Sequence, residues 1–300
     1  MSEPVVWPWN QPRAEDQTRW KFISSGVQKP VVNQFWPFSN ILRSAPLRER
    51  LIVSLEAASP HEALELAERL SGRVGMFAVG KHLFLKGGPE LIRELRHRGN
   101  EIFLDLKFHD EPRAIYKTAV EATRLGVKMF DLHPHCGSEV MEKVRGEVTR
   151  VCRNEGLRRP YILAVAIMTV LSRADQARAE GNGPLHDQVC RRARQAADAS
   201  LDGVLTSLAQ TAAVRATCGR RFTIVTSGIS LAPGGVLDPS VPGPAQAVRA
   251  GADYLIVGGA LWEAPDPGRT LSFLAEEMER GLRSSPRNPL EFFSDRPHWS

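Results

Sequence analysis

The segment FLDLKFHDEP, residues 103–112, brings together three charged side chains that could carry out chemistry. In an extended strand Asp105 and Lys107 project from the same face, because side chains two residues apart share a face. Asp110 follows three residues later, where we expect the strand to give way to a loop. A carboxylate beside an ammonium group provides a proton donor held in place by an opposite charge, which is the arrangement that general acid catalysis requires.

The alternative interpretation of this segment is an ion pair at the exposed edge of a strand, which would contribute little. Burying a charge is costly unless it is paired, so an enclosed carboxylate–ammonium pair indicates a functional site rather than an ion pair without a role. The residues around the pair favour the enclosed arrangement because they are apolar: Ile102, Phe103, Leu104 and Leu106.

Eight short apolar runs define the elements that must position these groups. They span residues 51–55, 74–79, 101–106, 127–132, 161–167, 202–206, 222–226 and 253–258. Amphipathic stretches with helical periodicity separate them, such as PHEALELAERL after the first run and PELIRELRHRG after the second. Eight strand–helix units in about 230 residues predict a (β/α)₈ barrel. An open doubly wound sheet is the alternative, but the first turn, EAASPHEA, lacks the GxGxxG pattern.

Catalytic groups of such barrels lie at the carboxyl ends of the strands and in the loops that follow them. Glu56, Ala78 and His133 occupy these positions in the first, second and fourth units. His135 lies two residues beyond His133. The remaining positions of this kind that could contact a ligand are Thr169, Ser207, Ser227, Gly228, Gly258 and Gly259.

The rest of the chain bounds the possible functions. We expect an irregular, tryptophan-rich arm over residues 1–50, the barrel over 51–280 and an irregular tail over 281–300. The net charge is +5, but residues 51–280 carry 29 basic and 28 acidic side chains, so the excess lies mostly in the ends and does not indicate nucleic-acid binding. The sequence contains no apolar run of about 18 residues, so it predicts no membrane span.

Four widely spaced cysteines, without a secretory leader, predict a cytoplasmic protein.

The run Asp105-x-Lys107-x-x-Asp110 resembles the signature of orotidine 5′-monophosphate decarboxylase and its superfamily of phosphate-binding barrels. The resemblance covers residues 51–280 and is closest to the bacterial type. It also includes LIVSLEAASPHEAL, LDGVLTSLAQ, VTSGI and VGGALWEAPDP. It implies decarboxylation of orotidine monophosphate to uridine monophosphate in pyrimidine biosynthesis, without a cofactor.

The resemblance also implies a role for each residue of the signature. Lys107 would protonate the carbon that loses CO₂, and Asp105 would hold Lys107 and press its charge against the substrate carboxylate. Asp110 would reach the active site of a neighbouring subunit, so the resemblance implies a homodimer with shared sites. The ligand would be a phosphorylated nucleoside or sugar.

Several positions depart from the family pattern. Glu56 stands where the family has aspartate, Ala78 where it has a second lysine, and Gly259 where it has the phosphate-binding arginine. Glu56, Asp105, Lys107 and Asp110 together carry three carboxylates and one ammonium, a formal charge of −2. The backbone N–H groups of Gly258 and Gly259 could still hold a phosphate.

These departures leave the substrate and two other functions open. One alternative is a non-catalytic dimeric barrel whose site no longer turns over. The other is a metal-dependent decarboxylase or epimerase of a sugar phosphate, in which Glu56, Asp105, His133 and His135 would be the candidate ligands of a divalent cation. We expect no metal, since His133 matches a family histidine that binds none.

Overall fold

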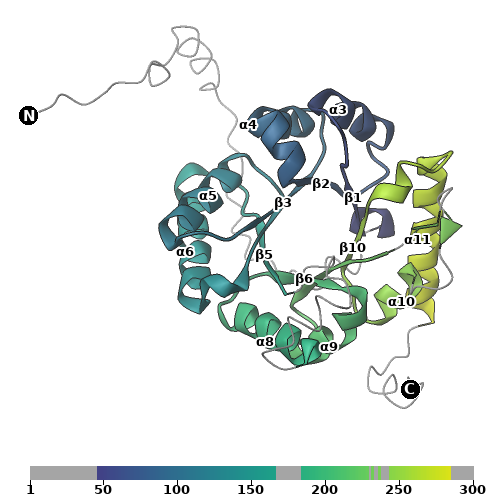
Figure 1. Ribbon diagram of the computed structural model, residues 1–300. Helices are drawn as coiled ribbons and strands as arrows, with labels where there is room; N and C mark the ends of the chain where they lie inside the picture. Colours follow the sequence, from purple (N-terminus) through teal and green to yellow (C-terminus); the bar gives the residue numbers. More distant parts are fainter. Residues whose placement is uncertain (1–45, 167–183, 230, 233–235, 238–242, 285–300) are drawn as a thin grey trace, which may run out of the picture. The chain divides into compact units, whose positions relative to one another are not determined.

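A closed barrel of eight parallel strands forms the centre of the protein. The computed structural model describes residues 46–166, 184–229 and 243–284, together with 231–232 and 236–237. Each barrel strand pairs with the next along the chain, and the last pairs with the first (Figure 1). The strands are β1 (Leu51–Ser54), β2 (Met76–Gly80), β3 (Ile102–Phe108), β4 (Met129–Leu132), β5 (Tyr161–Val165), β6 (Gly203–Ser207), β7 (Thr223–Ser227) and β10 (Tyr254–Val257). The predicted (β/α)₈ barrel is confirmed.

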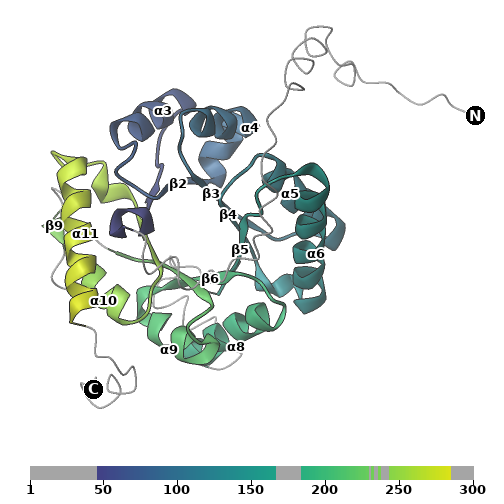
Figure 2. The same ribbon diagram turned by 180° about the vertical axis from the view of Figure 1, so that it is seen from behind.

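Helices surround the strands as an outer ring, which both face-on views show (Figures 1 and 2). The α-helices are α3 (Pro60–Arg69), α4 (Lys81–His97), α5 (Pro112–Arg124), α6 (Ser138–Glu155), α8 (Leu185–Asp198), α9 (Leu208–Cys218), α10 (Pro244–Arg249) and α11 (Pro267–Arg283). Within the described residues, short 3₁₀ turns accompany them: η2 (Leu47–Arg50), η3 (Pro134–Cys136) and η5 (Gly259–Leu261). A two-stranded antiparallel pair, β8 (Leu231–Ala232) and β9 (Val236–Leu237), follows β7.

Alternation along the strands divides the apolar side chains into two cores. Side chains on one face of each strand pack under the helices, as Val53, Leu104 and Ile224 do. Those on the other face fill the barrel interior, among them Ile52, Met76, Ala78, Phe103, Met129, Leu163, Val165, Leu205, Val225 and Tyr254. Burial of a large apolar side chain contributes about 1.5–3 kcal/mol, so both layers stabilise the fold. Asp105 and Lys107 therefore emerge above a packed interior rather than inside a pore.

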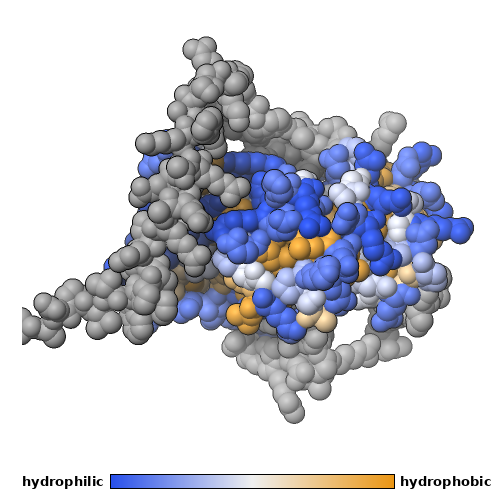
Figure 3. Space-filling model, turned by 90° about the horizontal axis from the view of Figure 1, so that it is seen from above, coloured by the Kyte–Doolittle hydropathy of each residue, from blue (hydrophilic) through white to orange (hydrophobic). Residues whose placement is uncertain are grey.

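The helices are amphipathic, as their sequences predict. On α11, Leu271, Leu274 and Met278 are buried against the barrel, while Arg283 on the outer face is exposed. The side of the molecule drawn in Figure 3 is mainly hydrophilic, with a narrower band of hydrophobic groups between the polar ones. No helix among the described residues is long and apolar enough to cross a membrane.

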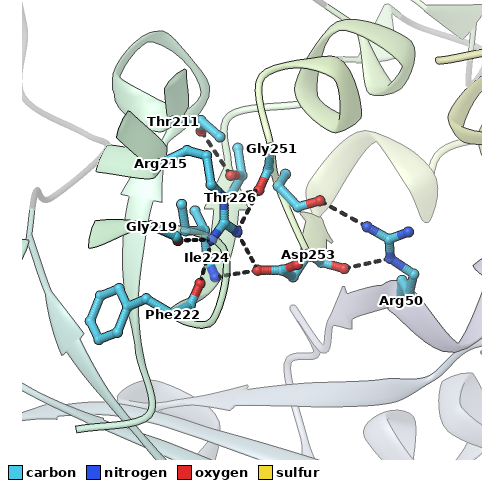
Figure 4. Close-up of polar contacts among 10 residues, drawn as sticks. Arg50, Thr211, Arg215, Gly219, Phe222, Ile224, Thr226, Gly251 and Asp253 are labelled. Atoms are coloured by element: carbon cyan, nitrogen blue, oxygen red, sulfur yellow. Dashed lines mark hydrogen bonds and ion pairs between the residues drawn. The ribbon is translucent and has the colours of Figure 1, made fainter. Parts of the chain in front are cut away.

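A polar network joins the segments that precede β7, β10 and β1 (Figure 4). The Arg215 guanidinium donates to the carbonyl oxygens of Phe222 at 2.7 Å and Gly251 at 2.7 Å, and pairs with Asp253 at 2.6 Å. The Asp253 carboxylate also accepts from the N–H of Ile224 at 2.8 Å. Arg50 donates to the carbonyl oxygen of Asp253 at 2.7 Å, which ties the start of β1 to that of β10 and helps to close the barrel.

The ends of the barrel differ slightly from the expected boundaries. The turn η2 lies within residues 1–50, and α11 continues to Arg283, inside the range 281–300. The rest of the expected arm and tail, residues 1–45 and 285–300, lies outside the described residues. The irregular structure expected for residues 1–45 and 285–300 therefore remains a prediction.

Candidate active site

A bulge in β3 positions the central lysine of the candidate site. Leu104 pairs with Phe130 of β4, but Phe108 pairs with Leu132, so β3 holds two more residues than β4 over this interval. Lys107 lies in the bulge with a φ of 50°, a left-handed conformation that is uncommon for a residue other than glycine. Such strained bulges occur next to active sites, where they direct a side chain.

The bulge produces the pair that the sequence predicted. The Lys107 ammonium forms a salt bridge with the Asp105 carboxylate, and the two side chains are 26% and 23% exposed. They are therefore partly desolvated, yet still open to a ligand. Lys107 lies where the regular pairing of β3 with β4 is interrupted, and its backbone N–H donates to Oδ1 of Asp131 at 2.7 Å. Backbone and side chain of Lys107 are thus each held by a carboxyl group.

Asp131 is a site residue that the sequence analysis did not single out. It is fully buried on β4, and its Oδ2 has no hydrogen-bond donor among the described residues. Burial, and then the charge and hydrogen bond of the neighbouring Asp105, raise the pKa of Asp131 well above its usual range. The signal was present in the sequence, because Met129, Asp131 and His133 alternate on the face that points into the barrel.

Glu56, which follows β1, contacts the turn that follows β10, the neighbouring strand of the barrel. Its Oε1 accepts from the backbone N–H of Gly259 at 3.1 Å. The carboxylate is exposed at the carboxyl end of β1. Glu56 thus hydrogen-bonds to the glycine turn rather than to Lys107.

Asp110 is exposed and accepts from the N–H of Glu111 at 2.7 Å. It lines a hollow of about 320 Å³ beside Lys107, Lys81 and Leu85. A larger hollow, about 540 Å³, lies on α3 and shares no residue with the strand ends. Of these two hollows, the smaller one is lined by both Lys107 and Asp110.

Three histidines gather where β3 and β4 end. The ring centroids of His109 and His133 are 5.0 Å apart, and those of His133 and His135 are 4.6 Å apart. Burial, and then the electrostatic interaction with His135 and His109, lowers the pKa of His133 to about 4, so its ring is neutral at pH 7. Among the residues that the structure describes, no group of three or more His, Cys, Asp or Glu side chains is arranged to hold a metal ion.

The remaining predicted ligand residues lie at the ends of β6, β7 and β10. Ser207 and Ser227 are adjacent in the sheet and half-buried. Gly228 has a φ of 91°, a conformation that glycine adopts without strain. Thr169 lies outside the described residues. Ala78, where the family has a lysine, is buried in the barrel interior.

The comparisons with known proteins agree with this geometry. Residues 49–272 match the sequence model of the orotidine 5′-phosphate decarboxylase / HUMPS family. The chain belongs to this family. It is 38% identical over 235 residues to the orotidine 5′-phosphate decarboxylase of Geobacter sulfurreducens, covering 78% of this chain and 98% of that protein. It is likewise 38% identical over 239 residues to the enzyme of that name from Trichlorobacter lovleyi, covering 79% of this chain and 98% of that protein.

A solved structure shares the same fold. The orotidine 5′-phosphate decarboxylase of Lactobacillus acidophilus superimposes with a TM-score of 0.66 at 28% identity, covering 76% of this chain and 98% of that one. The family expected from the Asp105–Lys107–Asp110 motif is confirmed. Family membership supports a decarboxylase-like enzyme, a carboxy-lyase, and favours neither the non-catalytic barrel nor the metal-dependent sugar-phosphate enzyme.

Proposed function

We propose that this chain is a cofactor-free decarboxylase of a pyrimidine 6-carboxylate of the orotidine 5′-phosphate type, acting in pyrimidine metabolism. The observation that carries this proposal is the Lys107 ammonium, paired with Asp105 on a strained bulge at the carboxyl end of β3. The names of the relatives supply the substrate class.

Each group of the pair has a separate part in the reaction. The Asp105 carboxylate repels the substrate carboxylate, which leaves as CO₂, and the electron pair of the broken C–C bond stays on the ring carbon. The Lys107 ammonium stabilises that developing negative charge and donates a proton to the carbon. Lys107 then regains a proton from water. Asp131 holds the backbone of Lys107, and its raised pKa favours the neutral form, so it adds little negative charge beside the substrate.

Orotidine 5′-monophosphate and orotidine, incubated with the purified full chain, test the function directly. Loss of the ultraviolet absorbance of the pyrimidine carboxylate is the measurement. Lys107→Ala removes the proton donor, so we expect the rate to fall by about a hundredfold to ten-thousandfold. Lys117→Ala removes an exposed ammonium from α5 and serves as the matched control. A wild-type chain inactive on both compounds, or a Lys107→Ala variant as active as the control, would refute the proposal.

We further propose that the active unit is a homodimer in which Asp110 enters the partner's site. Family resemblance gives Asp110 this role, and the surface around it supports an interface. Asp110 lines the hollow of about 320 Å³ together with Leu85, which is 85% exposed although it is a large hydrophobic residue. Exposed apolar groups of this kind are typical of interaction sites.

The cytoplasmic location is proposed on the state of the thiols. The cysteines all lie in the described residues and all are free: Cys136, Cys152, Cys190 and Cys218. Unpaired thiols are typical of proteins that remain in a reducing compartment.

A further inference from the structure

The carboxylate of Glu56 occupies the turn between β10 and η5. Its Oε1 accepts from the N–H of Gly259 at 3.1 Å. In (β/α)₈ barrels the turns after the last two barrel strands are the usual place for a phosphate, which is bound by backbone N–H groups. Here an anionic group of the protein itself already takes the hydrogen bond that a phosphate would need.

The glycines of this turn are matched to Glu56. A Cβ at position 258 would lie 2.5 Å from Oε1 of Glu56, and a Cβ at position 259 would lie 3.3 Å from Oε2. Any larger residue at 258 would therefore displace the carboxylate, and a side chain at 259 would press against it. Glutamate at position 56 and glycine at position 259 thus contact each other, although they are separated by 203 residues.

The Glu56 carboxylate makes the turn less favourable for a second anion. Two anionic groups that compete for one N–H, a few ångströms apart, repel each other. A hydroxyl group, by contrast, can donate to the free oxygen of a carboxylate. Glu56 is exposed, so a ligand at the carboxyl ends of the strands can reach it.

We propose that Glu56 is a specificity-determining residue that replaces the phosphate of a nucleotide, so that the site takes a pyrimidine nucleoside carboxylate with a free hydroxyl. The pyrimidine carboxylate end of this ligand rests on the proposed function. The hydroxyl end rests on Glu56, Gly258 and Gly259 alone. Orotidine is the simplest compound with both ends.

Binding of the reaction products tests the specificity of the site independently of the decarboxylation step. The dissociation constants of uridine and uridine monophosphate are measured calorimetrically on the full chain. We expect uridine to bind at least tenfold more tightly. Glu56→Gln removes the charge at nearly constant size, and Glu56→Ala also frees the N–H of Gly259; each is expected to shift the ratio at least tenfold toward uridine monophosphate. Glu65→Gln, which removes an exposed charge from α3, is the matched control and leaves the ratio unchanged.

Three binding results would overturn the inference: tighter binding of uridine monophosphate by the wild type, no detectable binding of uridine, or an unchanged ratio in both Glu56 variants. Thermal melting of each variant shows that it is folded. Turnover is read separately. Faster decarboxylation of orotidine monophosphate than of orotidine would keep the proposed function and refute the inference, whereas preferred binding of uridine without turnover of either carboxylate would do the reverse.

Discussion

Asp131 changes how the charge of the active site is counted. Counting Glu56, Asp105, Lys107 and Asp110 as one cluster gives −2, but only Asp105 of those carboxylates contacts Lys107. The structure adds Asp131 instead, buried and in contact with both members of the pair. Because ionising the buried Asp131 beside the Asp105 carboxylate is costly, the proton that Asp131 retains keeps this inner group close to neutral.

The retained proton makes the stability of the protein depend on pH. The folded state holds the proton of Asp131 to a higher pH than the unfolded chain does, so the free energy of unfolding falls as the pH rises above the unfolded value of about 3.9 toward the raised pKa. Asp131→Asn cannot titrate, and its amide can donate to Asp105. We expect this variant to be more stable than wild type at pH 8 by about 1–3 kcal/mol, and the difference to narrow toward pH 4.

Urea unfolding between pH 4 and pH 8 measures this difference. Asp198→Asn, which removes an exposed carboxylate at the end of α8, is the control and should show no such pH-dependent gain. A difference between Asp131→Asn and wild type that stays constant with pH would contradict the prediction.

The elements of the barrel were predictable from the sequence, but the bulge was not. A short apolar run marks each strand, and Pro60 after the capping residue Ser59 marks the start of α3. Lys107 lies in a segment that reads as regular strand, and its positive φ follows from pairing with β4 rather than from local preference. Contacts between distant residues, such as Lys107 with Asp131, depend on that register and have no local signal.

The amino ends of two pairs of strands are held by the same device. Asp202 precedes β6 and accepts from the N–H of Ile162 on β5, while pairing with Arg159 at 2.8 Å. Asp253 precedes β10 and accepts from the N–H of Ile224 on β7, while pairing with Arg215. Each aspartate satisfies a strand N–H at the edge of the ladder and neutralises an arginine, so each pair fixes the register of adjacent strands.

Substitution of Arg215 tests how much this aspartate–arginine pairing contributes to the free energy of unfolding. Arg215→Ala removes the ion-pair partner of the part-buried Asp253 carboxylate and the side-chain donor to the carbonyl oxygens of Phe222 and Gly251. We expect the free energy of unfolding to fall by about 2–4 kcal/mol, since removing one member of a buried pair is costly. The control Arg283→Ala removes a guanidinium that is 77% exposed and should cost less than about 1 kcal/mol. Equal losses of unfolding free energy in Arg215→Ala and Arg283→Ala would show that the Arg215 network stabilises the fold no more than an exposed ion pair does.

At the scale of the molecule, two chemically different groups of residues lie where the strands of one barrel end. The ammonium of Lys107 and its two carboxyl groups are contributed by β3 and β4. The Glu56 carboxylate and the glycine turn are contributed by β1 and β10, which meet only because the barrel closes. The motif around Lys107 was recognisable because it is local, whereas the contact of Glu56 with Gly259 required the closed fold.

The dimer is tested by mixing two inactive chains. If Asp110 completes the partner's site, then Lys107→Ala and Asp110→Ala are each nearly inactive alone. Co-expression forms half of the dimers as heterodimers, each with one intact site, so we expect about a quarter of wild-type activity. A mixture of Lys107→Ala and Asp105→Ala is the control and should recover nothing, because both residues serve the site of their own chain. Activity equal to the sum of the parents in the first mixture would show that each barrel works alone.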